Sequence, residues 1–512
     1  MDSHAPENPL GGEALNPPSG SAWLDPVRWL QGAAIGGCVL YTILFLYHGL
    51  VLVWFPFDVD NSEACLVYQG QRLAEGSFLY KPLNQEPYLA DNYPPLYPVV
   101  LAVGFKLTGP NFHWPRAVSL SATVLTAALI GFWTYHRTRD RASSWLAGLI
   151  YLSFYHVYDW GALARVDALG VALAVTGLTI FEIRRSWTAA LWFFFLALFT
   201  RQTLFAAPLA VAATLAGSFH RRSGLVFLAC LAGGMTALYG VLVILSSGEA
   251  WYHLIVYNAN EFRWSDVGVY LRQWLILYTV WGCAPLVILF SEFPGQTNQG
   301  AKRSPLLFWY TLFALGEAAL CGKIGSAPNY LLSLVTATAA GMGIIYHQAR
   351  GGTKESPHGT PVPASVPFVF LLAATVLQIA ATWHWPHRMD FSYTPTRADA
   401  HAGRLLQNEL RRTPGPILSD RAGVALMAGH PPVYEPFIGT QLVRQGLWDQ
   451  TPLLDRVAVR AFPMVILQFN LEDENWDRER FTPELIAALR EHYTRTRAYG
   501  PYRIYEPKPK VE

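Results

Sequence analysis

Three carboxylates follow one another closely where the first long apolar stretch of the chain ends. Asp58, Asp60 and Glu63 all belong to the segment FDVDNSEA. Charge is rare beside a hydrocarbon boundary and is usually functional there. Two carboxylates so spaced can act as a general base on a hydroxyl group, or they can share a divalent cation such as Mg²⁺ or Mn²⁺. The same residue types also cap surface helices, so the spacing fits both a reactive site and a helix N-terminus.

Two basic side chains interrupt apolar sequence further along. Arg201 lies in the break TRQT, and Lys323 lies in GKIGSAPNY. A charge in such surroundings is costly unless it reaches the surface or pairs, and a guanidinium fork suits two phosphate oxygens. We expect both cations to bind an anionic substrate. The alternative is an internal ion pair, for Lys323 with Glu317. The polar residues that flank these cations complete this candidate set: Gln202, Asn329 and Tyr330.

Four more candidates lie near the ends of apolar runs. Arg165 and Asp167 stand in ARVDALG. A structural salt bridge or helix cap explains them as well as substrate binding does. In the functional interpretation, Arg165 neutralises a phosphate and Asp167 orients the substrate. Asp91 and Tyr93 precede two prolines in DNYPPLYP. Because proline is tolerated at a helix start, this segment predicts a rigid corner that returns both residues to the bilayer.

The composition indicates a membrane protein. Of 512 residues, 52% are hydrophobic and 14% are charged, and the mean hydropathy is +0.22. Soluble domains carry about 25% charged residues. A net charge of +2 without a basic aromatic stripe argues against nucleic acid as a partner. The five cysteines have no CxxC spacing and predict neither a disulfide framework nor a zinc site.

Apolar runs divide the chain into a tail, a membrane region and a C-terminal segment. Residues 1–28 are rich in Pro, Gly and Ser and predict a disordered tail. Residues 29–385 predict about 11 spanning helices, at roughly 20 residues for each span. A first outer loop with juxtamembrane helices occupies 55–115, and one later span is expected over 273–290. Two short runs that flank Arg201 predict a hairpin of half-length helices.

Clusters of Lys and Arg predict the orientation. They occupy alternate loops, at 137–141, 184–185, 221–222, 302–303 and 350–354. The positive-inside rule places these loops and the N-terminus in the cytoplasm. The candidate site residues and the C-terminus then face the extracytoplasmic side.

Residues 386–512 have a different character, because strand-like and helix-like segments alternate there. This pattern predicts a small soluble extracytoplasmic α/β domain, large enough for its own core. The expected helices are 405–413 and 483–493, and the expected strands are 416–420, 462–469 and 503–507.

The order of these motifs resembles the GT-C superfamily of integral membrane glycosyltransferases. A first spanning helix precedes FDVDNSEA, a helix ending LAEG, NYPPLYP and then Arg116 at the next span. ARVDALGVAL, TRQT and GKIGSAPNY resemble landmarks of bacterial members that are similar to protein mannosyltransferases or aminoarabinose transferases. The resemblance covers about residues 29–347. It implies an α-helical polytopic protein of the bacterial plasma membrane.

The resemblance also implies an inverting hexosyl or pentosyl transferase. Such an enzyme moves a sugar from a polyprenyl-phosphate donor to a hydroxyl of a glycan, lipid or protein acceptor. Asp60 is the first choice for the general base and Asp58 the second. Arg201 and Lys323 would stabilise the phosphate leaving group. Some relatives use a divalent cation and others none, so a metal held by the two aspartates stays open. The C-terminal domain is expected to bind the acceptor.

Two other classes share some of these features. A transporter or lipid flippase also has broken helices and intramembrane charge, but near the midplane and commonly with inverted repeats. An inactive GT-C relative that serves as an assembly subunit would share the whole pattern. Retention of both Asp58 and Asp60 favours activity.

Overall fold

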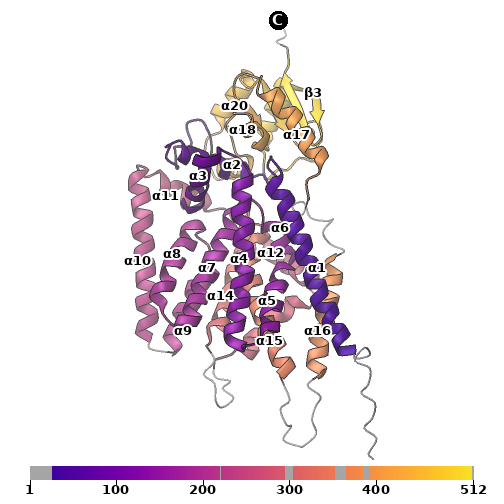
Figure 1. Cartoon of the computed structure of the whole chain (residues 1–512). Coiled ribbons are helices and arrows are strands. Elements are labelled where there is room, and N and C mark those ends of the chain that lie inside the picture. The colour runs from indigo at the N-terminus through magenta and orange to yellow at the C-terminus, as the bar shows by residue number, and fades with distance from the viewer. Residues whose placement is uncertain are drawn as a thin grey trace, which may run out of the picture.

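A computed structural model describes residues 26–218, 221–278, 280–294, 304–351, 365–383 and 393–509. A bundle of helices carries a smaller C-terminal domain at one end, and the short helices of the first outer loop lie at that same end (Figure 1). Nearly all of the predicted tail, 1–28, lies outside the described residues. The boundary near 385 falls in an undescribed stretch, before the domain helix that begins at Arg397.

The bundle contains α6 (Tyr155–Trp160) and α12 (Trp264–Leu277), but most of it is built from other helices of the described chain. They are α1 (Pro26–Trp54), α4 (His113–Thr138), α5 (Arg141–Leu152), α7 (Val166–Arg184), α8 (Trp187–Thr200), α9 (Ala206–Ser218), α10 (Arg221–Leu245), α13 (Ala284–Ser291), α14 (Leu306–Ala318), α15 (Leu332–Gly351) and α16 (Ser365–Trp383). Five segments of the described chain are helical, long and apolar enough to cross a membrane: Trp29–Trp54, His113–Thr138, Val166–Arg184, Arg221–Leu245 and Pro328–Arg350. The chain is therefore an integral membrane protein with several apolar spans, and the count of about 11 stays a prediction.

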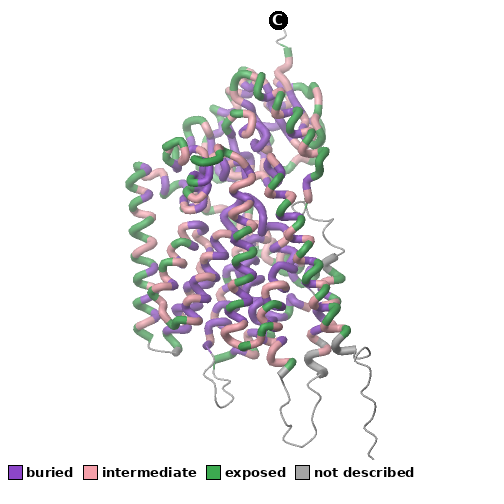
Figure 2. Tube along the Cα trace, in the orientation of Figure 1, coloured by how far each residue is buried: buried purple, intermediate pink, exposed green. Residues whose placement is uncertain are grey.

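Burial differs sharply across the bundle (Figure 2). In the most apolar stretch of the segment that contains nearly all of α15, 83% of the residues are buried, whereas in that of α10 only 17% are buried. On α10, Leu225 is 66% and Ile244 is 79% exposed. Apolar side chains on an outer helix suit contact with hydrocarbon, so α15 forms the centre of the bundle and α10 part of its lipid-facing edge.

The predicted hairpin of short helices is confirmed. α8 ends at Thr200 and α9 begins at Ala206, with Arg201 in the break between them. The single span expected over 273–290 is wrong. There α12 (Trp264–Leu277) ends, a 3₁₀ turn covers Trp281–Cys283, and α13 begins at Ala284. Pro285 explains the restart, because proline lacks the N–H that a helix interior needs but fits the first turn.

One arginine fixes the first outer loop to the bundle. Arg116, in the first turn of α4, pairs with Glu63 at 2.6 Å, and both side chains are fully buried. Its guanidinium also donates hydrogen bonds to the backbone oxygens of Leu52 (2.9 Å), Phe55 (2.8 Å) and Phe57 (2.6 Å). A buried ion pair is tolerated where further hydrogen bonds satisfy its remaining groups, as they do here. The loop that carries Asp60 is thereby held in place, between α1 and the helix α2 (Glu63–Ala74).

The C-terminal domain has a mixed four-stranded sheet of order β1-β2-β4-β3. β1 (Ile417–Ser419) pairs in parallel with β2 (Met464–Leu467), and β4 (Tyr502–Pro507) is antiparallel to both β2 and β3 (Tyr493–Tyr499). The predicted α/β character and all three predicted strands are confirmed. β3 was not predicted, because its segment YTRTRAY is mostly polar and half-exposed. The helices of the domain are α17 (Arg397–Leu410), α18 (Gly423–Met427), α19 (Pro436–Arg444), α20 (Thr451–Ala458) and α21 (Pro483–His492).

Candidate active site

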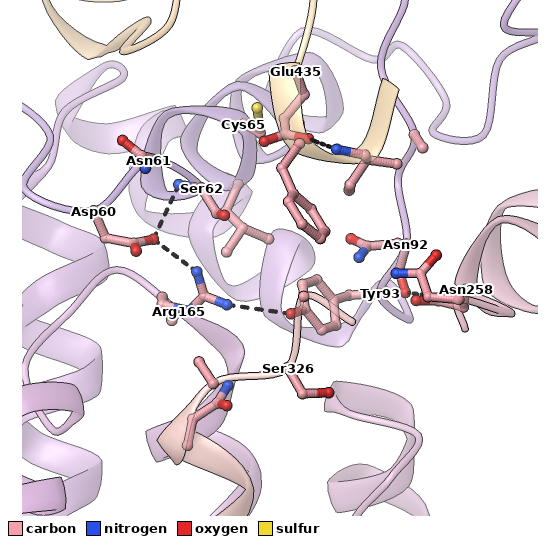
Figure 3. A pocket seen from close by; sticks show the side chains of 18 of the residues that line it. Asp60, Asn61, Ser62, Cys65, Asn92, Tyr93, Arg165, Asn258, Ser326 and Glu435 are labelled. Atoms are coloured by element: carbon pink, nitrogen blue, oxygen red, sulfur yellow. Dashed lines mark hydrogen bonds and ion pairs between the residues drawn. The ribbon is translucent and has the colours of Figure 1, made fainter. Parts of the chain in front are cut away.

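A cavity of about 600 Å³ lies between the end of the bundle and the C-terminal domain. Figure 3 shows part of its lining, with side chains from the first outer loop, the helix ends and the C-terminal domain turned toward one space. Most residues singled out from the sequence line it: Asp60, Asp91, Tyr93, Arg165, Arg201, Gln202, Lys323, Asn329 and Tyr330. The fold thus brings together residues from five separate segments of the chain.

Four charged side chains alternate in sign at the membrane side of this cavity. Arg165 contacts the carboxylates of Asp60 at 2.7 Å and Asp167 at 3.3 Å. Asp167 also pairs with Arg201 at 2.6 Å and accepts a hydrogen bond from Asn329 Nδ2 at 2.9 Å. Asp167 is fully buried and does not line the cavity. It therefore acts beneath the surface, where it neutralises and positions the two arginines.

Aromatic rings support both guanidinium groups. Arg165 lies 4.9 Å from the centre of the Trp160 ring, and Arg201 lies 4.2 Å from that of Tyr330. Such cation–π contacts strengthen when water is excluded. Burial opposes the charge of Arg165, but the carboxylates of Asp60 and Asp167 hold its pKa well above the ordinary value. Arg165 is therefore a permanent positive charge beside Asp60.

Lys323 lines the cavity and has no ion-pair partner among the residues that the structure describes. Burial lowers the pKa of its ammonium group, and the nearby positive charge of Arg201 lowers it further. The alternative of a pair with Glu317 is wrong. Glu317 instead accepts hydrogen bonds from Ser333 Oγ at 2.5 Å and Ala206 N at 3.1 Å. An unpaired cation at a cavity wall is suited to an anionic ligand.

Two of the three acids in FDVDNSEA do not line the cavity. Glu63 is committed to Arg116, as described above. Asp58 is 1% exposed and accepts a hydrogen bond from the backbone N–H of Gly423 at 3.1 Å. Burial raises the pKa of Asp58 to about 6. The substrate-binding role expected for Glu63 and the reserve role of Asp58 as base find no support in these positions, because each side chain secures the loop instead.

The remaining loop candidates line the cavity but are partly occupied by neighbours. Asp91 forms an ion pair with Arg72 and accepts a hydrogen bond from Tyr80 N at 2.9 Å. Gln202 donates from Nε2 to the backbone oxygen of Asn92 at 3.1 Å. The Tyr93 hydroxyl lies 3.4 Å from Arg165 Nη2. The contact between Gln202 and Asn92 joins the corner DNYPP to the break between α8 and α9.

The C-terminal domain supplies the roof of the cavity, which the sequence analysis missed. The roof residues are Arg421, Glu435, Phe437, Ile438, Gln468, Asp477, Glu479 and Arg480. Arg421 crosses to the first outer loop and donates to Asn61 Oδ1 at 3.0 Å and to the backbone oxygen of Val59. The sequence carries little indication of these roof residues, because charged residues are ordinary in a soluble domain. The pair Glu435-Pro436 indicates only the start of a helix.

The residues considered for a divalent cation do not fit a shared site. Asp60 is directed to Arg165, whereas Asp58 is directed to Gly423. In the described part of the chain, no group of three or more His, Cys, Asp or Glu side chains is placed to hold a metal ion.

No family model matches the sequence. The solved structures that share its fold include two of ArnT from Cupriavidus metallidurans. The structure bound to undecaprenyl phosphate has a TM-score of 0.58 and 13% identity, over 93% of this chain and 98% of that chain. The apo structure has a TM-score of 0.57 and 12% identity, over 93% and 100% of the two chains. The fold of this chain is therefore that of ArnT. The resemblance found in the motifs is confirmed at the level of the fold, and because the similarity covers 93% of this chain it extends into the C-terminal domain, which those motifs did not include.

Proposed function

We propose that this protein is an inverting glycosyltransferase that moves a sugar from a polyprenyl-phosphate donor to an acceptor hydroxyl. The observation that carries the proposal is a cavity whose lining includes both the carboxylate of Asp60 and the cations Arg165, Arg201 and Lys323. A base and a group of cations are what this reaction needs, one for the acceptor proton and the other for the phosphate.

Asp60 is the general base in this mechanism. Its Oδ2 is engaged by Arg165 at 2.7 Å and by the backbone N–H of Ser62 at 3.0 Å. The other oxygen, Oδ1, is left to accept a proton from the acceptor hydroxyl. As that proton moves to Asp60, the hydroxyl oxygen attacks C1 of the sugar and the bond between C1 and the phosphate oxygen breaks. Attack from the face opposite the phosphate inverts the configuration at C1.

The leaving group of this reaction is a polyprenyl phosphate, which departs with the electron pair of the broken bond. Arg201 and Lys323 both line the cavity, near enough for the charge of Arg201 to lower the pKa of Lys323, and they would stabilise the negative charge that develops. Lys323 brings an unpaired charge, and Arg201 is held in place by Asp167. ArnT, which has the same fold, binds undecaprenyl phosphate, and this supports a lipid phosphate as the ligand in our proposal.

The position of the cavity favours this chemistry over transport. Its lining residues come from the first outer loop, the ends of the helices and the C-terminal domain. The first outer loop and the C-terminal domain lie at one end of the bundle rather than midway along the helices (Figure 1). Transporters hold their substrate near the membrane midplane. In our proposal the cavity faces the extracytoplasmic side of a bacterial plasma membrane, and the N-terminus lies in the cytoplasm.

The test is a transfer assay with purified full-length protein in lipid nanodiscs. A panel of radiolabelled polyprenyl-phosphate sugars is offered with lipid, glycan and peptide acceptors, and label in the product is measured. We expect one donor to give product whose anomeric configuration is opposite to that of the donor. Retained configuration would overturn the inverting mechanism. Binding of polyprenyl phosphate without transfer from any donor would favour an inactive GT-C-like subunit.

A further inference from the structure

Several buried oxygen atoms in the cavity wall have no protein partner. Gln202 Oε1 and Asn329 Oδ1 are buried without a hydrogen bond in the described part of the chain. Their amide nitrogens donate to Asn92 O at 3.1 Å and to Asp167 Oδ1 at 2.9 Å, which fixes the orientation of each amide. The two oxygens are therefore free acceptors. Buried polar atoms are nearly always satisfied, so a ligand that supplies donors is the natural partner.

A carboxylate on the roof extends this set of acceptors. Glu435 lines the cavity yet is only 6% exposed. Its Oε2 accepts a hydrogen bond from Ile438 N and so caps α19. No Arg, Lys or His of the described chain lies within 4.0 Å of it as an ion-pair partner. In Figure 3 the Glu435 side chain extends from the C-terminal domain, and Asp60 and Arg165 lie on the other side of the same space.

The arginines of the roof form no ion pair with Glu435 in the described part of the chain, although the charge of Arg480 offsets part of the effect of burial on the Glu435 carboxyl. Arg421 binds Asn61 and Val59 of the first outer loop. Arg480 donates from Nη2 to the backbone oxygen of Asp420 at 2.9 Å. Burial raises the pKa of the Glu435 carboxyl. Burial of a carboxyl with one oxygen in use costs free energy, and a ligand that donates a hydrogen bond to the other oxygen lowers that cost.

We propose that Glu435 is a specificity-determining residue that accepts a hydrogen bond from the transferred sugar, together with the free oxygens of Gln202 and Asn329. This inference rests on the proposed function, and it assigns the cations and the hydrogen-bond acceptors of the cavity to different parts of the donor. Arg201 and Lys323 bind the phosphate, whereas the acceptor groups bind the donors on the sugar ring. The shared ligand chemistry is a hydrogen-bond donor, which is either a hydroxyl or a protonated amine.

The test separates binding of the sugar from binding of the lipid phosphate. Full-length Glu435→Gln and wild-type protein in nanodiscs are titrated with polyprenyl phosphate, a neutral polyprenyl-phosphate hexose and a polyprenyl-phosphate amino sugar. Glutamine keeps an oxygen for Ile438 N, so the cap of α19 survives. We expect about tenfold weaker binding of a sugar-bearing donor, because hydrogen bonds to charged groups are the stronger ones. Binding of polyprenyl phosphate alone stays unchanged.

The arms of this experiment identify the group that is bound. A loss confined to the amino sugar assigns an amine to Glu435, and a loss with the neutral hexose assigns a hydroxyl. The control is Glu472→Gln, an exposed carboxylate of the same domain outside the cavity lining, which should match wild type with every ligand.

Two results would overturn the inference alone. One is equal affinity of Glu435→Gln and wild type for every sugar donor, and the other is an equal loss for sugar donors and bare polyprenyl phosphate. Wild-type protein that binds none of the three ligands would overturn the proposed function as well, so the two failures are distinguishable.

Discussion

The floor and the roof of the cavity are built from different kinds of sequence. The floor, formed by Arg165, Arg201 and Lys323, stands at the ends of apolar helices. The roof, which includes Arg421 and Glu435, belongs to a soluble domain of ordinary composition. Charge in apolar sequence is costly and is kept where it has a purpose, so the floor was visible in the sequence. Charge in a soluble domain is common and carries no such signal.

The floor and the roof also differ in the contacts that their arginines make. The arginines of the floor are held by buried carboxylates, at 2.7 Å between Arg165 and Asp60 and at 2.6 Å between Arg201 and Asp167. Arg421 of the roof instead bonds to a side-chain amide and a backbone oxygen of the first outer loop. We infer that the floor supplies fixed charges for the reaction, whereas the roof closes the cavity and discriminates between ligands.

The largest expected effect belongs to the floor. Asp60→Asn removes the proton acceptor while keeping a side chain of the same shape. We expect sugar transfer to fall by about 10²–10⁴-fold, the usual contribution of a general base. The measurement is the turnover rate at saturating donor and acceptor, with donor binding measured alongside. Wild-type turnover in this variant would contradict the assignment of the base.

Asp58→Asn is the matched control for that variant. It makes the same chemical change two residues away, at a carboxylate that contacts Gly423 rather than the cavity. Asparagine can still accept that hydrogen bond, so we expect turnover close to wild type. A loss at Asp58 as large as that at Asp60 would mean that the distinction between the two acids is wrong.

The helices of the membrane region were largely predictable, because long apolar runs leave few other structures. The break at Arg201 was predictable for the same reason, as polar residues interrupt the run there. The break before Ala284 was not, since Trp281, Cys283 and Ala284 keep the segment apolar across it. Only Pro285 indicates the break in the sequence, and a single proline near a helix end is also compatible with a continuous span.

The candidate site was predictable residue by residue but not as a set of contacts. Arg165 and Asp60 are 105 positions apart in the chain, and no local pattern pairs them. The sequence also could not distinguish Asp58 from Asp60, because the C-terminal domain, through Gly423, decides which acid is covered. Glu435 was missed because its partners across the cavity are brought there only by the fold.

A smaller effect is expected for the phosphate side of the floor. Arg201→Gln removes a donor to the lipid phosphate, and one charge-assisted hydrogen bond contributes about 1.5–3 kcal/mol. We therefore expect donor affinity to fall about 10–100-fold, while the KM for the acceptor changes little. Titration with polyprenyl phosphate measures this directly. An equal loss for donor and acceptor would indicate general damage to the cavity.

Arg201→Lys is the control for charge. It keeps a cation beside Asp167 but loses the forked geometry, so we expect donor affinity between those of wild type and Arg201→Gln. Thermal unfolding of both variants is measured as well, because Arg201→Gln leaves the buried Asp167 with one ion pair fewer. If Arg201→Lys matched Arg201→Gln in donor affinity, charge at this position would not be what binds the donor.

The smallest effect is expected at the seam where floor and roof meet. Gly325 has φ +80°, and a Cβ added there would lie 2.3 Å from the Phe437 ring. Gly325→Ala must therefore push the roof outward, and such overpacking costs about 1–3 kcal/mol. Gly446→Ala is the control, since it has φ +66° but no atom within 4 Å. We expect Gly325→Ala to lower the melting temperature more than Gly446→Ala does, to speed protease cleavage near the C-terminal domain, and to reduce turnover less than tenfold. Equal shifts of the melting temperature in the two variants would mean that backbone conformation alone causes the effect. The contact between Gly325 and Phe437 would then not be what holds the cavity closed.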